Sequence, residues 1–276
     1  MSEQIRQGSL KLVNPAQIAR LGALSVMRAR IRTMLKFVWS ISASAVLNPT
    51  LYLLSVGVGV GKLINAHTGG VDGVKYLTFL APALLATAAI QNALDETVFP
   101  VLEGFKWNKS FYAMNSTPLS GKQIANGVLL AAMARTLFSV SVYGVIISLF
   151  GGFSSWRGWF AIPTALFAGA AFGAFIMGFA VSSKNEDSFF MILGRFIFMP
   201  LFLFSGTFYQ LSSMPIFLRP IGWVSPLWHT TELGRWLTYG HHLSPLMVFV
   251  HFAYLSAMFA VGLRYTHKQF EIRLRK

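Results

Sequence analysis

The sequence contains no cysteine, which excludes disulfide bonds and thiolate-ligated metal sites. Charged residues are scarce, at 12% of the chain against about 25% in an average soluble domain. Acidic residues are scarcer still, with 9 Asp and Glu against 23 Lys and Arg. Instead, 54% of the residues are hydrophobic. They recur in runs of about 20, which match the roughly 30 Å of hydrocarbon that a helix must cross, so the sequence predicts an all-α integral membrane protein.

Nucleotide and metal motifs are also missing. The glycine-rich stretch ending in Gly61-Lys62 comes nearest to a phosphate loop, but Val56 and Leu63 stand where that motif requires Gly and then Ser or Thr. The pair His241-His242 has no carboxylate or further His at the spacing of metal ligands on a helix. We therefore expect no catalytic residue, no bound cofactor and no metal in this chain.

Six transmembrane helices are predicted, at about 37–60, 76–99, 128–150, 158–181, 189–208 and 245–263. They define a transmembrane domain at 37–264. Residues 1–36 precede it as a cytoplasmic N-terminus with an interfacial helix, and 265–276 follow it as a basic cytoplasmic tail.

The interfacial helix is predicted from its amphipathic pattern. Asn14-Pro15 is typical of an N-cap and first helical position. Six apolar residues then share one helical face, and four cations mostly flank it: Leu21, Leu24, Met27, Ile31, Met34 and Leu35, with Arg28, Arg30, Arg32 and Lys36. Arg20 falls inside the apolar arc. Such a helix lies in the interface with its cations towards anionic headgroups; the alternative is a simple basic stop before the first span.

Lys and Arg are distributed unevenly over the predicted loops. Sixteen lie on the side of the two termini and the 100–127 loop, and five lie on the opposite side. Because these residues concentrate on the cytoplasmic side of membrane proteins, both termini and the 100–127 loop are predicted to be cytoplasmic. The net charge of +14 is then mostly a topology signal, and we expect no nucleic-acid partner.

The 100–127 segment is too long for a tight turn and contains helix signals of its own. Thr117 can act as an N-cap, Pro118 follows at the first helical position, and Gly127 stands where a helix stop is expected. A structured cytoplasmic segment in a chain without a nucleotide site favours docking of a separate, soluble motor protein.

Four charged residues fall inside predicted spans. Asp95 and Glu96 in the second span, Arg135 in the third and Arg195 in the fifth all lie within two turns of the cytoplasmic end. Charge in hydrocarbon is costly unless it is paired, so we expect the four to meet at one level near the inner surface. The pairing either fixes helix packing or rearranges when a cytoplasmic gate moves, and both interpretations stay open.

Residues 209–244 form the longest external segment and are too apolar for a solvated loop. Prolines at 215, 220 and 226 divide it, and His229, Glu232 and Trp236 fall on one face of the helix predicted after Ser225-Pro226. Two short helices that dip partway into the outer leaflet as a re-entrant hairpin fit this pattern, since non-helical backbone at that depth must be buried in protein or line a cavity.

Five stretches together resemble the permease subunits of ABC-2 type exporters: 48–57 (NPTLYLLSVG), 79–85 (FLAPALL), 112–120 (YAMNSTPLS), 200–209 (PLFLFSGTFY) and 225–235 (SPLWHTTELGR). The resemblance covers about 30–268 and is nearest to nodulation-factor and lipo-oligosaccharide exporters, with daunorubicin-type drug permeases close by. Gln210 departs from the Pro often found after Phe-Tyr, and Asn115-Ser116 from a more usual Ala-Thr.

The resemblance implies roles for three segments. A coupling helix within 104–127 would sit in a cleft of the ATP-binding subunit, through Gly104, Phe105, Lys106, Trp107, Tyr112, Thr117, Pro118, Leu119 and Ser120. Residues 182–188 would form a smaller second contact. Residues 214–240 would form an external helical hairpin near the exit, including Pro226, His229, Glu232 and Arg235.

By this resemblance the chain is the permease of an ATP-driven exporter in the bacterial cytoplasmic membrane. Two permease copies would assemble among the membrane lipids with two ATPase subunits, and these partner subunits would bind the ATP and Mg²⁺. The cargo would be amphipathic: a glycolipid, a lipo-oligosaccharide or a hydrophobic drug. One alternative is an ion-coupled carrier. Another is a membrane enzyme that modifies lipids, with Asp95 and Glu96 as acid and base.

Overall fold

The computed structural model describes residues 15–183 and 192–275, and the chain there is helical apart from its connections. The strand-like pairing in these residues is limited to an isolated bridge between Val71 and Val74. The helices are α1 (Pro15–Leu35), α2 (Val38–Tyr52), η1 (Leu53–Val60), α3 (Gly61–Thr68), α4 (Tyr76–Leu102), η2 (Glu103–Trp107), α5 (Ser110–Asn115), α6 (Gly121–Leu149), η3 (Trp156–Phe160), α7 (Ala161–Ser182), η4 (Ile192–Phe198), α9 (Met199–Phe204), η5 (Leu211–Ser213), α10 (Arg219–Trp223), α11 (Pro226–Tyr239) and α12 (Pro245–Leu274).

Five stretches of the described residues are long and apolar enough to cross a membrane: Val38–Thr68, Tyr76–Trp107, Gly121–Leu149, Trp156–Ser182 and Pro245–Leu274. They correspond to the first four predicted spans and the sixth. The predicted fifth span contains the shorter apolar helix Ile192–Phe204, which is about 20 Å long at 1.5 Å per residue. Residues 189–191 of that span lie outside the described residues, so a sixth crossing stays a prediction.

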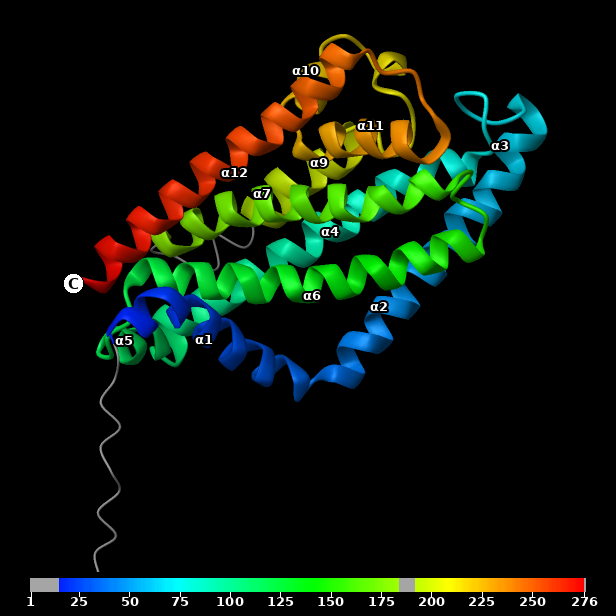
Figure 1. Ribbon diagram of the computed structural model, residues 1–276. Coiled ribbons are helices and arrows are strands. Elements are labelled where there is room, and N and C mark those ends of the chain that lie inside the picture. Colours follow the sequence, from blue (N-terminus) through cyan, green and yellow to red (C-terminus); the bar gives the residue numbers. More distant parts are fainter. Residues whose placement is uncertain (1–14, 184–191, 276) are drawn as a thin grey trace, which may run out of the picture.

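Helices α4, α6 and α7 form the centre of the bundle, and α12 runs along α7 (Figure 1). Small residues allow the close approach that membrane helices use for packing. A Cβ on Gly169 of α7 would lie 2.9 Å from the Ala89 carbonyl oxygen of α4, and a Cβ on Gly262 of α12 would lie 2.6 Å from the Phe175 backbone nitrogen of α7. These contacts fix the spacing of α7 from α4 and of α12 from α7.

The bundle has two distinct ends. Helices α1 and α5 and the C-terminus gather at one of them, called here the α5 end (Figure 1). Helices α3, α10 and α11 lie at the other, called the α11 end. Between them α1 and α2 form a V, with its corner at Lys36-Phe37.

The helix boundaries within 100–127 differ from the prediction. Helix α4 continues through Pro100, and α6 begins at Gly121, where Ser120 caps it by accepting a hydrogen bond from the Gln123 amide at 3.3 Å. The Gln123 side chain in turn accepts from the Ser120 amide at 2.9 Å. This capping box makes Ser120, and not Thr117, the N-cap.

Gly127 is not a helix stop, because it lies inside α6. A Cβ there would lie 2.4 Å from the Cβ of Val26 and 2.7 Å from the Ala23 carbonyl oxygen. Gly127 therefore lets α1 pack directly on α6. The same contact is fastened by Gln123, whose Nε2 donates to the Ile18 carbonyl at 2.8 Å.

The predicted external segment contains α10 and α11. Ser225 caps α11 by accepting from the Leu227 amide at 3.2 Å, and Gly240 ends it with a left-handed φ of 77°. Ten of the 14 residues of α11 are buried, because the helix packs against α4, α7 and α12. The predicted start and stop of this helix are correct.

Candidate functional site

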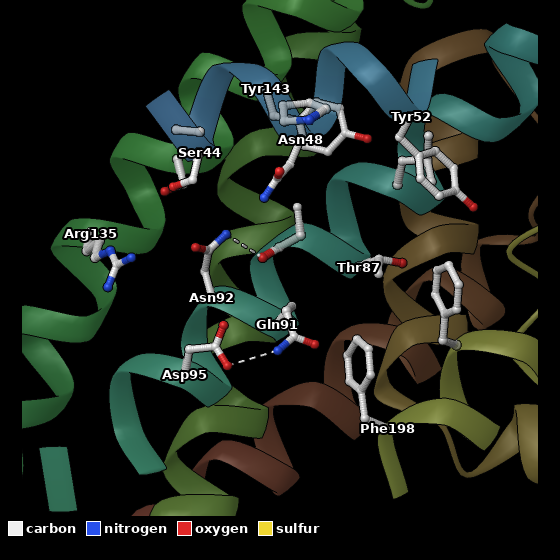
Figure 2. A pocket seen from close by; sticks show the side chains of 16 residues that line it. Ser44, Asn48, Tyr52, Thr87, Gln91, Asn92, Asp95, Arg135, Tyr143 and Phe198 are labelled. Atoms are coloured by element: carbon white, nitrogen blue, oxygen red, sulfur yellow. Dashed lines mark hydrogen bonds between the residues drawn. The ribbon is translucent and has the colours of Figure 1, made fainter. Parts of the chain in front are cut away.

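A cavity of about 520 Å³ lies between α2, α4, α6 and the η4–α9 pair (Figure 2). Its volume is in the range of sites for small molecules. Three helices line it with polar rows: Ser44, Asn48 and Tyr52 on α2; Thr87, Gln91 and Asp95 on α4; and Arg135, Ser139 and Tyr143 on α6. Residues four apart share one helical face, so each helix turns one polar stripe towards the cavity.

The opposite wall is aromatic. Phe198 and Phe202 line the cavity, and their rings stack at 6.3 Å between centroids. A cavity with aromatic rings on one side and polar side chains on the other suits a ligand that has both an apolar surface and hydrogen-bonding groups.

Several polar groups of the cavity remain available to a ligand. Gln91 Nε2 donates to Asp95 Oδ1 at 2.9 Å, and Asn92 Nδ2 donates to the Ala88 carbonyl at 2.8 Å (Figure 2). Among residues 15–183 and 192–275, neither amide oxygen has a hydrogen-bond donor, so both can accept from a ligand. Within the described chain, the Asn48 amide and the Tyr52 hydroxyl have no hydrogen-bond partner. The cavity thus offers uncharged donors and acceptors in a largely apolar surrounding.

A second cavity of about 460 Å³ adjoins the first towards the α5 end, since Asp95 and Arg135 line both. It is also lined by Arg30 and Glu103, which form a salt bridge at 3.1 Å between α1 and η2. The two cavities together form a polar track from the middle of α2 to the corner between α1 and α2.

The charged residues predicted to meet inside the bundle do so only in part. Arg135 forms an ion pair with Glu96, and Asp95 lies beside this pair with Gln91 as its hydrogen-bond partner. Arg195 is exposed on η4, and among the described residues no salt bridge joins it to Asp95 or Glu96. A position two turns from the end of a span fixes the level of a side chain but not the direction in which it points.

The predicted coupling residues divide into a buried and an exposed set. Gly104 and Phe105 are buried, because the Phe105 ring packs edge-on against Phe111 at 5.0 Å and a Cβ on Gly104 would lie 2.4 Å from the Phe111 ring. The exposed residues are Trp107, Thr117, Pro118 and Ser120, with Lys106, Tyr112 and Leu119 half-buried beside them. An aromatic core therefore supports an exposed surface at the α5 end.

At the α11 end, Arg235 is the largest fully buried side chain. Its guanidinium donates to Glu232 Oε1 at 3.0 Å and to the Gly206 carbonyl at 2.6 Å, and it stacks on the Phe79 ring at 3.8 Å. A charge buried this deeply must be paired and hydrogen-bonded, and these contacts provide both. Arg235 therefore ties α11 to α4 and to the turn after α9.

His241 extends this network outward. Its Nδ1 lies 2.5 Å from Asp72 Oδ2, and its Nε2 lies 3.3 Å from Glu232 Oε2. The hydrogen bond with Glu232, helped by the charge of Asp72, raises the pKa of His241 against the opposing effect of burial. Tyr239 and Gln210 also donate to Asp72, at 2.8 and 2.9 Å. The loop before α4 is thereby joined to the end of α11.

Sequence reasoning missed the cavity residues other than Asp95 and Arg135. Their signal was present as polar residues repeated four apart in three predicted spans. A single polar residue in a span carries little information, but three rows with the same spacing would have indicated a common polar surface.

Helices of membrane length around a polar cavity define a multi-pass membrane protein. The family model of the ABC-2 type transporter matches residues 23–239. The chain belongs to this family.

Individual relatives agree. The chain is 26% identical to Nodulation protein J of Rhizobium leguminosarum bv. viciae over 189 residues, which are 68% of this chain and 71% of the relative. It is 28% identical to Nodulation protein J of Sinorhizobium fredii over 188 residues, 68% and 70% of the two chains. It is also 26% identical to the inner membrane transport permease YadH of Escherichia coli K12 over 183 residues, 66% and 69%.

Proposed function

We propose that this chain is the membrane subunit of an ATP-driven exporter, in which a separate subunit binds and hydrolyses ATP. Membership of the ABC-2 type transporter family carries this proposal. Two copies of the chain form the transport path together with two ATPase subunits. The α5 end and both termini face the cytoplasm in this proposal, and α1 lies in the membrane interface.

The motor docks on the exposed surface at the α5 end, through Trp107, Thr117, Pro118 and Leu119. Pro118 and Thr117 are exposed, as a docking surface requires. The buried ring of Phe105 beneath them would carry a displacement of this surface into α4. Of the second predicted contact, 182–188, residues 184–188 lie outside the described chain.

The cargo is amphipathic, and the 520 Å³ cavity receives its hydroxyl- and amide-bearing head group. The uncharged polar side chains of α2 and α4 would hydrogen-bond the head group, while Phe198 and Phe202 would cover its apolar side. A lipo-oligosaccharide fits this chemistry better than a purely hydrophobic drug, because the latter would leave the Asn48 amide and the Gln91 amide oxygen desolvated and unpaired. The hairpin of α10 and α11 lies near the exit.

The test is transport by proteoliposomes that contain the permease and its ATPase partner, with a fluorescent N-acylated oligosaccharide as the probe. We expect ATP-dependent transport. Gln91→Leu removes one hydrogen bond to the probe, worth about 1.4 kcal/mol, so the half-saturating probe concentration should rise about tenfold. Leu47→Met is the matched control, because Leu47 is exposed on α2 and does not line the cavity.

Two other outcomes would refute the proposal. Transport that survives ATP depletion but collapses with the proton gradient would identify an ion-coupled carrier. Covalent turnover of the probe that Glu96→Gln abolishes would identify an enzyme.

A further inference from the structure

Helix α12 is longer than a membrane crossing requires, and its final turns are buried. It is one helix of 30 residues, about 45 Å long, against roughly 30 Å of hydrocarbon. Within an apolar stretch of 18 residues of this helix, only 17% of the residues are buried in the bundle. The buried residues of α12 form one stripe that reaches its final turns: His251, Leu255, Gly262, Thr266, Phe270 and Leu274. The helix therefore packs on the bundle along one stripe, and this stripe continues to its C-terminal end.

The end of this stripe packs against the aromatic core of the 100–127 segment. The Phe270 ring lies 5.1 Å from that of Phe105 and 5.6 Å from that of Phe111. The Arg273 guanidinium lies 4.6 Å over the Phe105 ring, and its Nη1 donates to the Val181 carbonyl at 2.5 Å. The end of α12 thus joins η2 and α5 to the last turn of α7.

A second set of contacts fixes the same end of α12 to the start of α6. Lys122 Nζ lies 3.4 Å from Glu271 Oε1, and Asn115 Nδ2 donates to the Leu274 carbonyl at 3.4 Å. A Cβ on Gly121 would lie 3.2 Å from Leu274 Cδ1. Five elements, η2, α5, α6, α7 and α12, therefore meet at Phe270–Leu274. They form the packed core beneath the predicted coupling residues.

The opposite end of α12 is fastened to the external helices. His229 Nδ1 lies 2.7 Å from His251 Nδ1, and His229 Nε2 lies 3.0 Å from the Trp223 carbonyl oxygen. Since a carbonyl only accepts, Nε2 of neutral His229 carries the proton, so His251 donates at Nδ1. Tyr254 stacks on His229 at 3.9 Å and donates to the Val224 carbonyl. His251 and Phe270 are 19 residues apart, or about 28 Å along the helix.

We propose that α12, in addition to α4, transmits movement of the 100–127 segment through the bundle. Its end moves as one rigid body with the 100–127 segment, and the helix carries that displacement directly to α10 and α11. Phe270 and Arg273 are the positioning residues of this link. The inference rests on the proposed function, because it requires a motor that moves the 100–127 segment.

The first test compares Phe270→Ala with wild type in the reconstituted complex, by measuring probe molecules exported per ATP hydrolysed. We expect complex assembly and ATP hydrolysis to persist while this ratio falls at least tenfold. Phe270→Leu, which keeps apolar volume, should restore most of it. Phe252→Ala is the control, because Phe252 is exposed on the same helix. An unchanged ratio in Phe270→Ala would overturn the inference, whereas a wild-type complex without ATP-driven export would overturn the proposed function itself.

The second test does not depend on Phe270→Ala folding. Because the chain has no cysteine, Gly121→Cys with Glu271→Cys places a single thiol pair at the contact, where a Cβ on Gly121 would lie 3.4 Å from the Glu271 backbone nitrogen. If α12 and the start of α6 move as one body, oxidation of the pair leaves export unchanged. Loss of export on oxidation, with recovery on reduction, would mean that the two must separate and would overturn the inference.

Discussion

Glu96→Gln removes the carboxylate that faces Arg135 inside the helix bundle. The Glu96 side chain is 10% exposed and that of Arg135 26% exposed, so the remaining guanidinium keeps only limited access to water. Breaking a fully buried ion pair costs about 3–5 kcal/mol, because it leaves an uncompensated charge. Asp95 lines the same cavities as Arg135 and offers it a substitute partner. We therefore expect a loss of about 2–3 kcal/mol in the free energy of unfolding.

Replacement of the other partner, Arg135, should reduce the free energy of unfolding by more. Arg135→Met leaves both Glu96 and Asp95 without the cation, so we expect the full value of about 3–5 kcal/mol. The double variant Glu96→Gln with Arg135→Met removes the pair together, and replacement of a buried pair by uncharged groups is often close to neutral. We expect the double variant to lose less than Arg135→Met alone, which is the signature of direct coupling.

The assay is denaturant unfolding of the purified permease in detergent micelles, followed by tryptophan fluorescence. Glu103→Gln is the matched control, because Glu103 also pairs with an arginine but is 38% exposed. Such a pair contributes at most about 1 kcal/mol. The reasoning fails if Glu96→Gln costs no more than Glu103→Gln, or if the losses of the two single variants simply add in the double variant.

Two further predictions concern the ends of the molecule. Gly127→Leu should displace α1 from α6, since even a Cβ at position 127 would lie 2.4 Å from the Cβ of Val26. In the Gly127→Leu background, a thiol introduced by Val26→Cys should then react with maleimide. Continued protection of this thiol would contradict the packing. The raised pKa of His241 means that its bonds to Asp72 and Glu232 stabilise the fold fully below about pH 6.5. This stabilisation is lost as pH rises through the folded-state pKa, so Tm should fall from pH 6 to pH 9, and His241→Gln should reduce the slope; equal slopes would rule out this role.

Features that depend on local chemistry were predictable from the sequence. The apolar runs predicted five helices of membrane length in the described residues, because a membrane crossing requires only sufficient length and apolar side chains. The start of α11 at Pro226 and its stop at Gly240 followed from capping preferences that act within a few residues.

Features that depend on contacts between distant segments were not predictable. Gly127 resembles a helix stop until α1 is placed against it, because a glycine is equally suited to a helix end and to close packing. Arg195 resembles Arg135 in depth but points elsewhere, since depth along a span does not determine rotation about its axis. Likewise, the polar rows form a cavity only when α2, α4 and α6 are brought together.

The most direct measurement is the ATPase activity of the nucleotide-binding partner, alone and reconstituted with the permease. We expect the wild-type permease to change this activity and Pro118→Asp and Leu119→Asp to abolish the change while still inserting in the membrane. Pro118 is exposed at the α5 end, so its substitution leaves the bundle intact. Ser154→Asp is the control, at an exposed position between α6 and η3. Equal activity with wild type, Pro118→Asp and Leu119→Asp would contradict docking at the 100–127 segment.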